Sequence, residues 1–338
     1  MQWTKGISVW QQRMKAASVS PRTIKNYTQW MQRMARKWPA LKASQFARAV
    51  ELSSAMLADQ GLSPTTIQHY QCAAARFALD MLKWDKHDAR DLIRAKSLDP
   101  SPDVPTVEEV KRIAAALPDP YRLPCLLMYG CGLRLGEVLG LRLRDVDLDR
   151  KQLTIQLAKG QKSRRIPIPD SLVPLLLSAV NNAMALYQSD LAAGGIGASA
   201  RYKGQAWTAS QARRPEHYWL FPQESTVPDT ASGLAVRVPI HASRLQKAMK
   251  AARLSAKVAK HITPHSLRHA YAVHSLEAGL HLRTIQEHLG HASLETTAKY
   301  LKIATVRAEA VPSSLFDRWL DDTFEHQSAL ALDLQRSA

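Results

Sequence analysis

The chain has 338 residues, enough for two domains of ordinary size, and its 46% hydrophobic and 22% charged residues are typical of a globular protein. It contains no run approaching the roughly 18 consecutive apolar residues of a membrane span, and its first residues lack the charged-then-apolar layout of a secretory signal. Three cysteines without CxxC spacing indicate free thiols in a reducing compartment, so we expect a cytoplasmic protein that does not act at a membrane.

The formal net charge of +17 favours a polyanionic partner, although a solvated basic surface would carry the same charge. Residues 1–100 contain 16 Lys and Arg against 7 Asp and Glu, a net charge of +9 in under a third of the chain. The charge therefore supports a nucleic-acid partner only in combination with sequence motifs that indicate the same partner.

Residues 1–98 predict a small helical bundle. A Ser-Pro pair opens each of two helices expected over 22–38 and 64–84, because serine is a good N-cap and proline suits the first helical turn. Apolar residues follow at helical spacing, and basic side chains occupy the opposite faces. We expect these faces to lie against a DNA backbone, with Arg22 and Lys25 as candidate contacts.

Three prolines mark a linker, which we place at 99–105. The second domain would then span 106–338. It begins with a helix expected over 107–117, which Thr106 caps and which carries acidic residues in its first turn, where the helix dipole favours them.

Beyond the arginine-containing segment near residue 134, the periodicity becomes that of short strands. Strands are expected at 143–147, 152–157 and 165–168. The last two would be joined by a hairpin loop over 158–163. An elaborated insertion follows at about 185–222, and helical character returns at 242–257 and extends to a tail helix at about 313–335. The expected fold class is mainly α with a small antiparallel β-sheet, that is, α+β.

Two arginine motifs supply candidate phosphate ligands. Arg134 lies in the run GCGLRLGE, and Arg268 lies in the run TPHSLRH. In the second run, Thr263 and Pro264 are the expected N-cap and first-turn residues of a helix. Guanidinium groups match phosphate oxygens bidentately, and two of them could offset the extra charge of a pentavalent transition state. Glu137 could orient Arg134 from three residues away, and His265 has the same spacing from Arg268. Taken alone, either arginine would more often form a surface ion pair.

Tyr300 is the candidate nucleophile. A phenol has a pKa of about 10, so attack requires that its proton be removed and its charge stabilised, which His265 and the arginines could do. His291, directly after a glycine, is a further imidazole in the same part of the chain. These groups would cleave a phosphodiester without a metal ion, and no metal ligands are predicted. A lone tyrosine at a helix end is more often a half-buried packing residue.

Basic residues of the expected hairpin complete the set. Lys159, at its tip, could protonate a departing 5′ oxygen from within a minor groove. Lys162 is the alternative for that role, and a plain backbone contact is the expectation for the other lysine. Lys162 and Arg164 are therefore candidate DNA contacts.

In this order and with these surroundings, the candidate residues resemble the catalytic set of the tyrosine recombinase (phage-integrase, Xer-like) family. The matching positions are Arg134, Lys159, His265, Arg268, His291 and Tyr300. The resemblance extends from about residue 20 to 302. It implies a helical, SAM-like core-binding domain that clamps DNA, followed by a tyrosine-recombinase catalytic domain.

The resemblance also implies a mechanism. Tyr300 attacks the scissile phosphate to form a 3′-phosphotyrosine and a free 5′ hydroxyl, while His265 acts on the tyrosine proton and Lys159 protonates the leaving oxygen. The phosphorane is stabilised by Arg134, Arg268 and His291. Bond energy stays in the ester, so no cofactor, ATP or metal is expected. A homotetramer would exchange strands between two DNA sites through a Holliday junction, with the tail helix docked on the neighbouring protomer or on its own domain.

Within the family, the chain is most similar to integron integrases. The stretch between Lys159 and His265 is longer than in minimal Xer proteins, and the sequence at 240–248 also resembles that of integron integrases. The insertion begins like theirs at 189–197 and departs at 201–207, which bears on whether it grips extrahelical bases of a folded single strand. We expect a bacterial, nucleoid-associated enzyme that integrates and excises cassettes. The alternative is a Xer-like or mobile-element integrase acting on duplex sites.

Two other classes share part of the pattern. A type IB topoisomerase uses the same phosphotyrosine chemistry as a monomer, but the helical first domain and the tail favour a recombinase. A non-catalytic DNA-binding protein would explain the charge, but it would not explain His265, Arg268, His291 and Tyr300 in this order.

Overall fold

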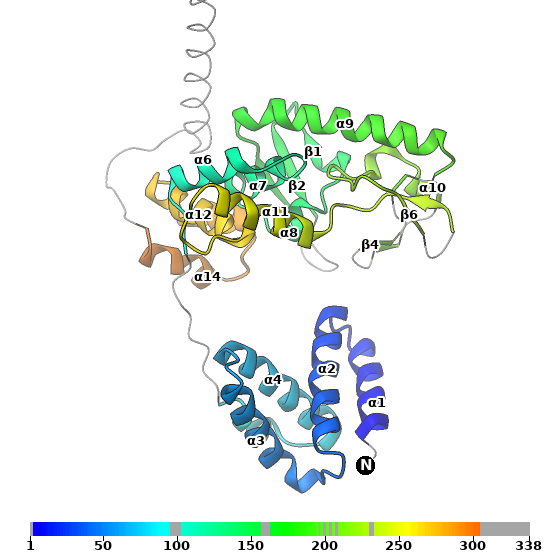
Figure 1. The fold of residues 1–338 in the computed structure, drawn as a ribbon, viewed down its shortest axis with the longest axis vertical. Helices are drawn as coiled ribbons and strands as arrows, with labels where there is room; N and C mark the ends of the chain where they lie inside the picture. The colour runs from blue at the N-terminus through cyan, green and yellow to red at the C-terminus, as the bar shows by residue number, and fades with distance from the viewer. Residues whose placement is uncertain are drawn as a thin grey trace, which may run out of the picture. The chain divides into compact units, whose positions relative to one another are not determined.

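The computed structural model describes residues 3–94, 103–156, 163–195, 197–198, 201–202, 205–206, 209–229 and 233–304 (Figure 1). The chain divides into two compact units, residues 1–100 and 101–338, and each is described by itself. The described residues are mostly helical, with small antiparallel sheets, which confirms the predicted fold class. No helix among them is both long enough and apolar enough to span a bilayer.

The first unit is a bundle of helices around an aromatic core. Its elements are α1 (Trp3–Ala16), α2 (Pro21–Lys37), η1 (Ala43–Gln45), α3 (Phe46–Asp59), α4 (Pro64–Phe77), η2 (Ala78–Leu82) and α5 (Lys86–Asp91). Ser20 and Ser63 cap α2 and α4 as predicted, each accepting a backbone N–H bond. The helix expected to continue to residue 84 changes instead into a π-helical turn at η2, and Lys83 ends it in the left-handed conformation with φ 62°.

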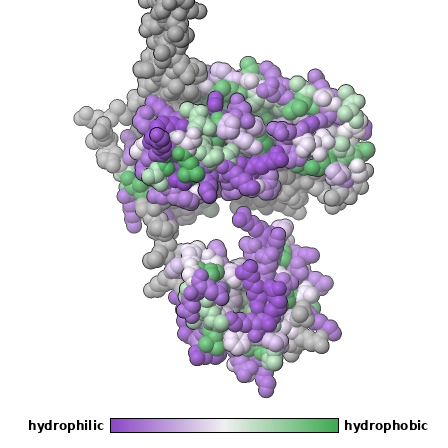
Figure 2. Space-filling model, in the orientation of Figure 1, coloured by the Kyte–Doolittle hydropathy of each residue, from purple (hydrophilic) through white to green (hydrophobic). Residues whose placement is uncertain are grey.

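Helix α2 is amphipathic. Its buried residues, Ile24, Thr28, Met31 and Met34, follow the helical period. Arg22 and Lys25 are exposed on the remaining face. Figure 2 shows a hydrophilic surface along this helix. The two side chains are therefore free to meet an external partner, and their contact with DNA stays a prediction.

The second unit begins with helices that lead into a small sheet. These elements are α6 (Val107–Ala116), α7 (Arg122–Gly130), α8 (Leu135–Val138), η3 (Leu143–Asp145), β1 (Val146–Asp147), β2 (Gln152–Ile155) and β3 (Arg164–Pro167). The strands form one antiparallel sheet in the order β1-β2-β3, with Leu153 opposite Ile166, both buried. The first expected strand is shorter than predicted, because residues 143–145 form a 3-10 turn. Lys159 and Lys162 lie outside the described residues.

A long helix carries the chain from this sheet into the insertion. The elements are η4 (Asp170–Leu172), α9 (Val173–Ala192), β4 (Arg201–Tyr202), β5 (Gln205–Ala206), α10 (Ala209–Ala212), η5 (Pro215–His217), β6 (Val227–Pro228) and β7 (Ala235–Val236). Tyr187, Tyr218 and Trp219 belong to a separate small core here. An almost fully buried ion pair, Asp190–Arg237 at 2.5 Å, lies beside it. In Figure 1, α10 and β6 lie at the end of α9 distant from α12.

The last described elements are α11 (Ala242–Ser255), α12 (Pro264–Glu277), α13 (Leu282–Leu289), α14 (Leu294–Ala298) and η6 (Lys299–Lys302). Helix α12 is buried on nearly all sides, packing against α7, α13 and η6. Thr263 caps it as predicted. This central helix therefore brings the Arg268 motif into contact with early and late segments of the described part of the domain. The tail at 313–335 lies outside the described residues.

Candidate active site

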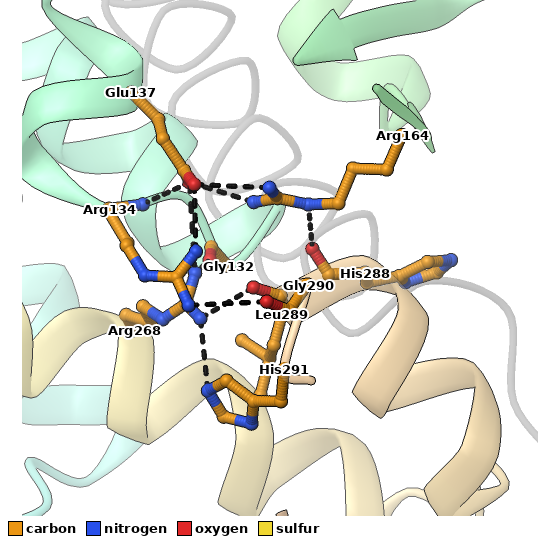
Figure 3. Close-up of polar contacts among 9 residues, drawn as sticks. All are labelled: Gly132, Arg134, Glu137, Arg164, Arg268, His288, Leu289, Gly290 and His291. Carbon is orange, nitrogen blue, oxygen red and sulfur yellow. Dashed lines mark hydrogen bonds and ion pairs between the residues drawn. The ribbon is translucent and has the colours of Figure 1, made fainter. Parts of the chain in front are cut away.

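A single carboxylate, Glu137, organises the arginines of the site (Figure 3). Arg134 is the N-cap residue of α8 rather than a residue within a helix, and Glu137, at the third helical position, accepts bonds from its backbone N–H at 2.9 Å and its Nη1 at 2.8 Å. Arg164 donates to both carboxylate oxygens, at 3.0 and 2.7 Å. Burial alone would raise the pKa of Glu137, but the bonds and charges of Arg164 and Arg134 outweigh it and lower the pKa to about 2.

Arg164 is a candidate DNA contact, and in the structure its side chain is bonded inside the protein. Its side chain is 10% exposed, and its Nε donates to the carbonyl of His288 at 2.8 Å, in addition to its bonds to Glu137. The guanidinium thus joins the first residue of β3 to α8 and α13 inside the protein. Gly290 is required beside it, since the residue adopts φ 62° and a Cβ there would lie 2.8 Å from Arg164 Nη1.

Arg268 is almost completely buried, with 1% of its surface exposed. Nη1 donates to the carbonyl of Gly132 at 2.6 Å, and Nη2 donates to the carbonyl of Leu289 at 2.6 Å. Burial and the Arg134 charge lower the pKa of Arg268 to about 9, so the guanidinium remains protonated at neutral pH. Arg134, by contrast, is 39% exposed. Of the two candidate phosphate ligands, Arg268 is therefore internal and Arg134 faces solvent, and both are fixed by protein acceptors.

His291 lies between Arg268 and the segment that carries the tyrosine. Its Nε2 is 3.1 Å from Nη2 of Arg268, and its Nδ1 is 2.9 Å from the hydroxyl of the buried Thr297. A guanidinium has no acceptor, so Nε2 must accept and the ring proton must sit on Nδ1. Burial and the neighbouring cations, Arg268 first, lower the pKa of His291 to about 4, which agrees with a neutral ring.

Tyr300 lies on η6 with 6% of its surface exposed, and its ring stacks on that of His291 at a centroid distance of 6.4 Å. Its hydroxyl lies 2.8 Å from Nδ1 of His269. The sequence analysis had instead expected His265 to act on this hydroxyl. His265 is exposed in the first turn of α12, and its ring contacts the ring of His269 at a centroid distance of 4.4 Å. Burial raises the pKa of Tyr300 against the opposing charges of Arg268 and Arg134, so the phenol is protonated at neutral pH.

The structure thus brings five of the six candidate residues into one region, and the sixth, Lys159, lies outside the described residues. The sequence analysis missed His269 and Thr297. His269 could have been found, because it follows His265 by four residues and therefore shares its helical face. Thr297 carries no such signal. Among the described residues, no three His, Cys, Asp or Glu side chains gather as metal ligands.

Comparison with known proteins shows the family of the chain. Residues 104–307 match the model of the phage integrase family. The chain is 30% identical over 316 residues to an integrase/recombinase of Escherichia coli, which covers 90% of this chain and 91% of that protein. It is 30% identical over 288 residues to the tyrosine recombinase XerA of Thermococcus kodakarensis, covering 84% and 86%. Its fold is similar to that of the Tn1549 transposon integrase in complex with transposon right end DNA, with 15% identity, a TM-score of 0.59 and coverage of 96% and 99%.

Proposed function

Since the chain belongs to the phage integrase family of tyrosine recombinases, we propose that it cleaves and rejoins DNA strands at specific sites through Tyr300. The tyrosine oxygen forms a bond to the scissile phosphorus as the bond from phosphorus to the 5′ oxygen breaks. The products are a 3′-phosphotyrosine and a 5′ hydroxyl, and attack by a 5′ hydroxyl reverses the step. The observation that carries this proposal is the stacking of the Tyr300 ring on His291, which itself contacts Arg268.

The cationic side chains would stabilise the phosphorane. Arg134 is exposed enough to reach a bound phosphate, while Arg268 and His291 present donors from the interior once their mutual contact is exchanged for phosphate oxygens. Because these groups are held by protein acceptors before DNA arrives, little reorganisation is required at the moment of reaction. Removing one such donor typically slows a reaction of this kind by about 10²–10³-fold.

The leaving 5′ oxygen requires a proton, which we assign to Lys159, with Lys162 as the alternative. The support comes from the chain connection: the segment that holds both lysines joins β2 to β3, and β3 begins at Arg164, which is bonded to Glu137 of the site. The chain thus runs from this segment into a residue that contacts the site.

The partner would be DNA, bound by residues 1–98 and by the catalytic domain at 106–338, with 99–105 as the linker. Exposed Arg22 and Lys25 on α2 would contact its backbone. Strand exchange needs two sites, so we infer a homotetramer that passes through a Holliday junction, with the tail at 313–335 docked on the neighbouring protomer or on its own domain. Such a substrate would place the enzyme with the bacterial nucleoid.

For the substrate, we propose recombination of cassettes in the manner of integron integrases. The support is the insertion at about 185–222, which has its own small core. The buried ion pair between Asp190 and Arg237, the residue after β7, fixes it to the following segment, so it can present a defined surface. The 30% identity to a XerA recombinase favours the alternative, a Xer-like or mobile-element enzyme that acts on duplex sites.

Covalent capture tests the function. The protein and its Tyr300→Phe variant would be mixed with a pool of nicked duplex and hairpin single-stranded oligonucleotides, and SDS-resistant adducts would be sequenced. Adducts that depend on Tyr300 would support strand cleavage, with enrichment of hairpins favouring the integron substrate and enrichment of duplexes the Xer-like one. The absence of adducts from wild-type protein that still binds the pool would refute the proposal.

A further inference from the structure

An imidazole other than the two expected from the family resemblance lies 2.8 Å from the hydroxyl oxygen of Tyr300. We propose that His269 is a catalytic residue that accepts the Tyr300 proton through Nδ1 as the tyrosine oxygen attacks the scissile phosphate. This inference rests on the strand cleavage proposed above. It reassigns the proton-accepting step from His265, which would act on the tyrosine only through the His269 ring.

The described neighbours of the hydroxyl favour His269 over the other groups. Arg134 and Arg268 carry N–H donors and no acceptor. Both ring nitrogens of His291 are engaged, one by Arg268 and one by Thr297. His269 presents Nδ1 to the phenol at 2.8 Å, a distance at which a proton can pass directly.

The elements hold this pair in place. His269 is half-buried in the second turn of α12, and Tyr300 is buried on η6, which packs against α12. His265 stands one turn earlier in α12, with its ring edge-on to that of His269 at 4.4 Å. His269 therefore contacts both the buried phenol and the exposed His265 ring.

The charges around His269 make the base dependent on substrate. Burial, His265 and Arg268 lower the pKa of His269 to about 4, so the ring is neutral and can accept a bond from the phenol. Two titratable groups of other elements also lie at this site: Tyr300, which contacts His269, and His291, whose ring stacks on that of Tyr300. A bound phosphodiester would offset the arginine charge, which raises the basicity of His269 once DNA is in place.

The proposed step balances. The O–H bond of Tyr300 breaks and an N–H bond forms at Nδ1 of His269, while the tyrosine oxygen bonds to phosphorus and the 5′ oxygen leaves with a proton from the separate acid. In the reverse direction, His269 returns its proton to the tyrosine oxygen as the phosphotyrosine bond breaks.

Two variants separate proton transfer from positioning. In His269→Asn, the amide lies near the former Nδ1 and its oxygen can still accept a bond from Tyr300, but it cannot take up a proton at neutral pH. His269→Ala removes both properties. His265→Asn is the matched control on the same helical face, and His274→Asn tests a buried histidine that bonds another tyrosine, Tyr129, at 3.0 Å.

The kinetic measurement is the rate of SDS-resistant adduct formation with the oligonucleotide pool, as a function of pH. We expect His269→Asn to be slowed by about 10²–10⁴-fold. Its rate should lose the acidic limb of the wild-type profile, and added imidazole should partly restore His269→Ala. His274→Asn should leave the limb unchanged, and His265→Asn should keep it but move it to higher pH, because His265 no longer lowers the pKa of His269. A profile that is unchanged in His269→Asn, or lost instead in His265→Asn, would overturn the inference and leave strand cleavage intact.

A DNA-free measurement distinguishes this failure from failure of the proposed function. In ¹⁵N-histidine NMR spectra, the Nδ1 signal of His269, assigned with His269→Asn, should be that of an unprotonated nitrogen and should shift in Tyr300→Phe. An unshifted signal would contradict the proposed pair. If the signal shifts in Tyr300→Phe but the wild-type protein forms no adduct, the proposed strand cleavage is refuted, and the proton transfer is refuted with it.

Discussion

Nε2 of His291 lies 3.1 Å from Nη2 of Arg268, so in the DNA-free protein this nitrogen is an acceptor that carries no proton. To stabilise a phosphorane, the same nitrogen would have to donate to a phosphate oxygen. DNA binding must therefore change the protonation of the ring, or move its proton from Nδ1, where Thr297 now accepts it.

This relationship predicts that DNA binding takes up a proton. The pKa of His291 is lowered to about 4 in the free protein by burial and by Arg268, and a bound phosphate would raise it, so affinity should increase as pH falls through the interval between the two values. Calorimetry with duplex oligonucleotides in buffers of different ionisation enthalpy measures the uptake. His291→Gln, whose amide nitrogen can donate without titrating, should show less uptake than wild type. Equal uptake in both proteins would contradict the assignment.

Glu137 should contribute to stability in a pH-dependent way. Its pKa falls from the ordinary 4.5 to about 2 on folding, so the contribution is fully present above about pH 4.5 and is lost as pH falls towards 2. Glu137→Gln should lower the free energy of unfolding by about 3 kcal/mol at neutral pH and by progressively less in acid. Urea unfolding measures this difference, with Glu295→Gln as a control at an exposed carboxylate of the same unit. A loss independent of pH would show that charge is not the cause.

Thr297 should be required for His291 to keep its orientation. Thr297→Val preserves the side-chain shape but removes the hydroxyl that contacts Nδ1, leaving a polar group without its partner. We expect a loss of about 1–3 kcal/mol in stability and slower adduct formation, whereas Thr297→Ser should retain both. If Val and Ser variants cleave at the same rate, the hydroxyl does not position the imidazole.

Arg164 and Lys25 should respond differently to substitution. Arg164→Met removes a buried partner of Glu137, so we expect about 3 kcal/mol lower stability and an unchanged salt dependence of DNA binding. Lys25→Met on the exposed face of α2 should leave stability unchanged and reduce the slope of log K against log salt by about 0.9. Fluorescence titrations of a duplex oligonucleotide over a salt series measure the slopes. A reduced slope in Arg164→Met would show that Arg164 contacts a DNA phosphate.

Local features of the chain were readable from sequence because they depend on near neighbours. Ser20, Ser63, Thr106 and Thr263 were predicted as helix caps and each accepts the expected backbone bond, since capping involves residues only three positions apart. The change from helical periodicity to short strands after Arg134, and with it the fold class, was predicted in the same way. The family was identified from the order of residue types, which similarity over most of the chain confirms.

Contacts between distant segments were decided by the tertiary structure. Both His265 and His269 lie on one face of α12, and which ring meets Tyr300 depends on how α12 packs against η6, a segment 31 residues from His269. The sequence suggested that Arg164 lies at the surface, but the position of β3 relative to α8 places its guanidinium against Glu137, 27 residues away in the chain. Sequence patterning thus determined the element types and the chemical groups, whereas packing between elements determined which group each one faces, because side-chain partners are chosen by three-dimensional proximity and burial rather than by spacing along the chain.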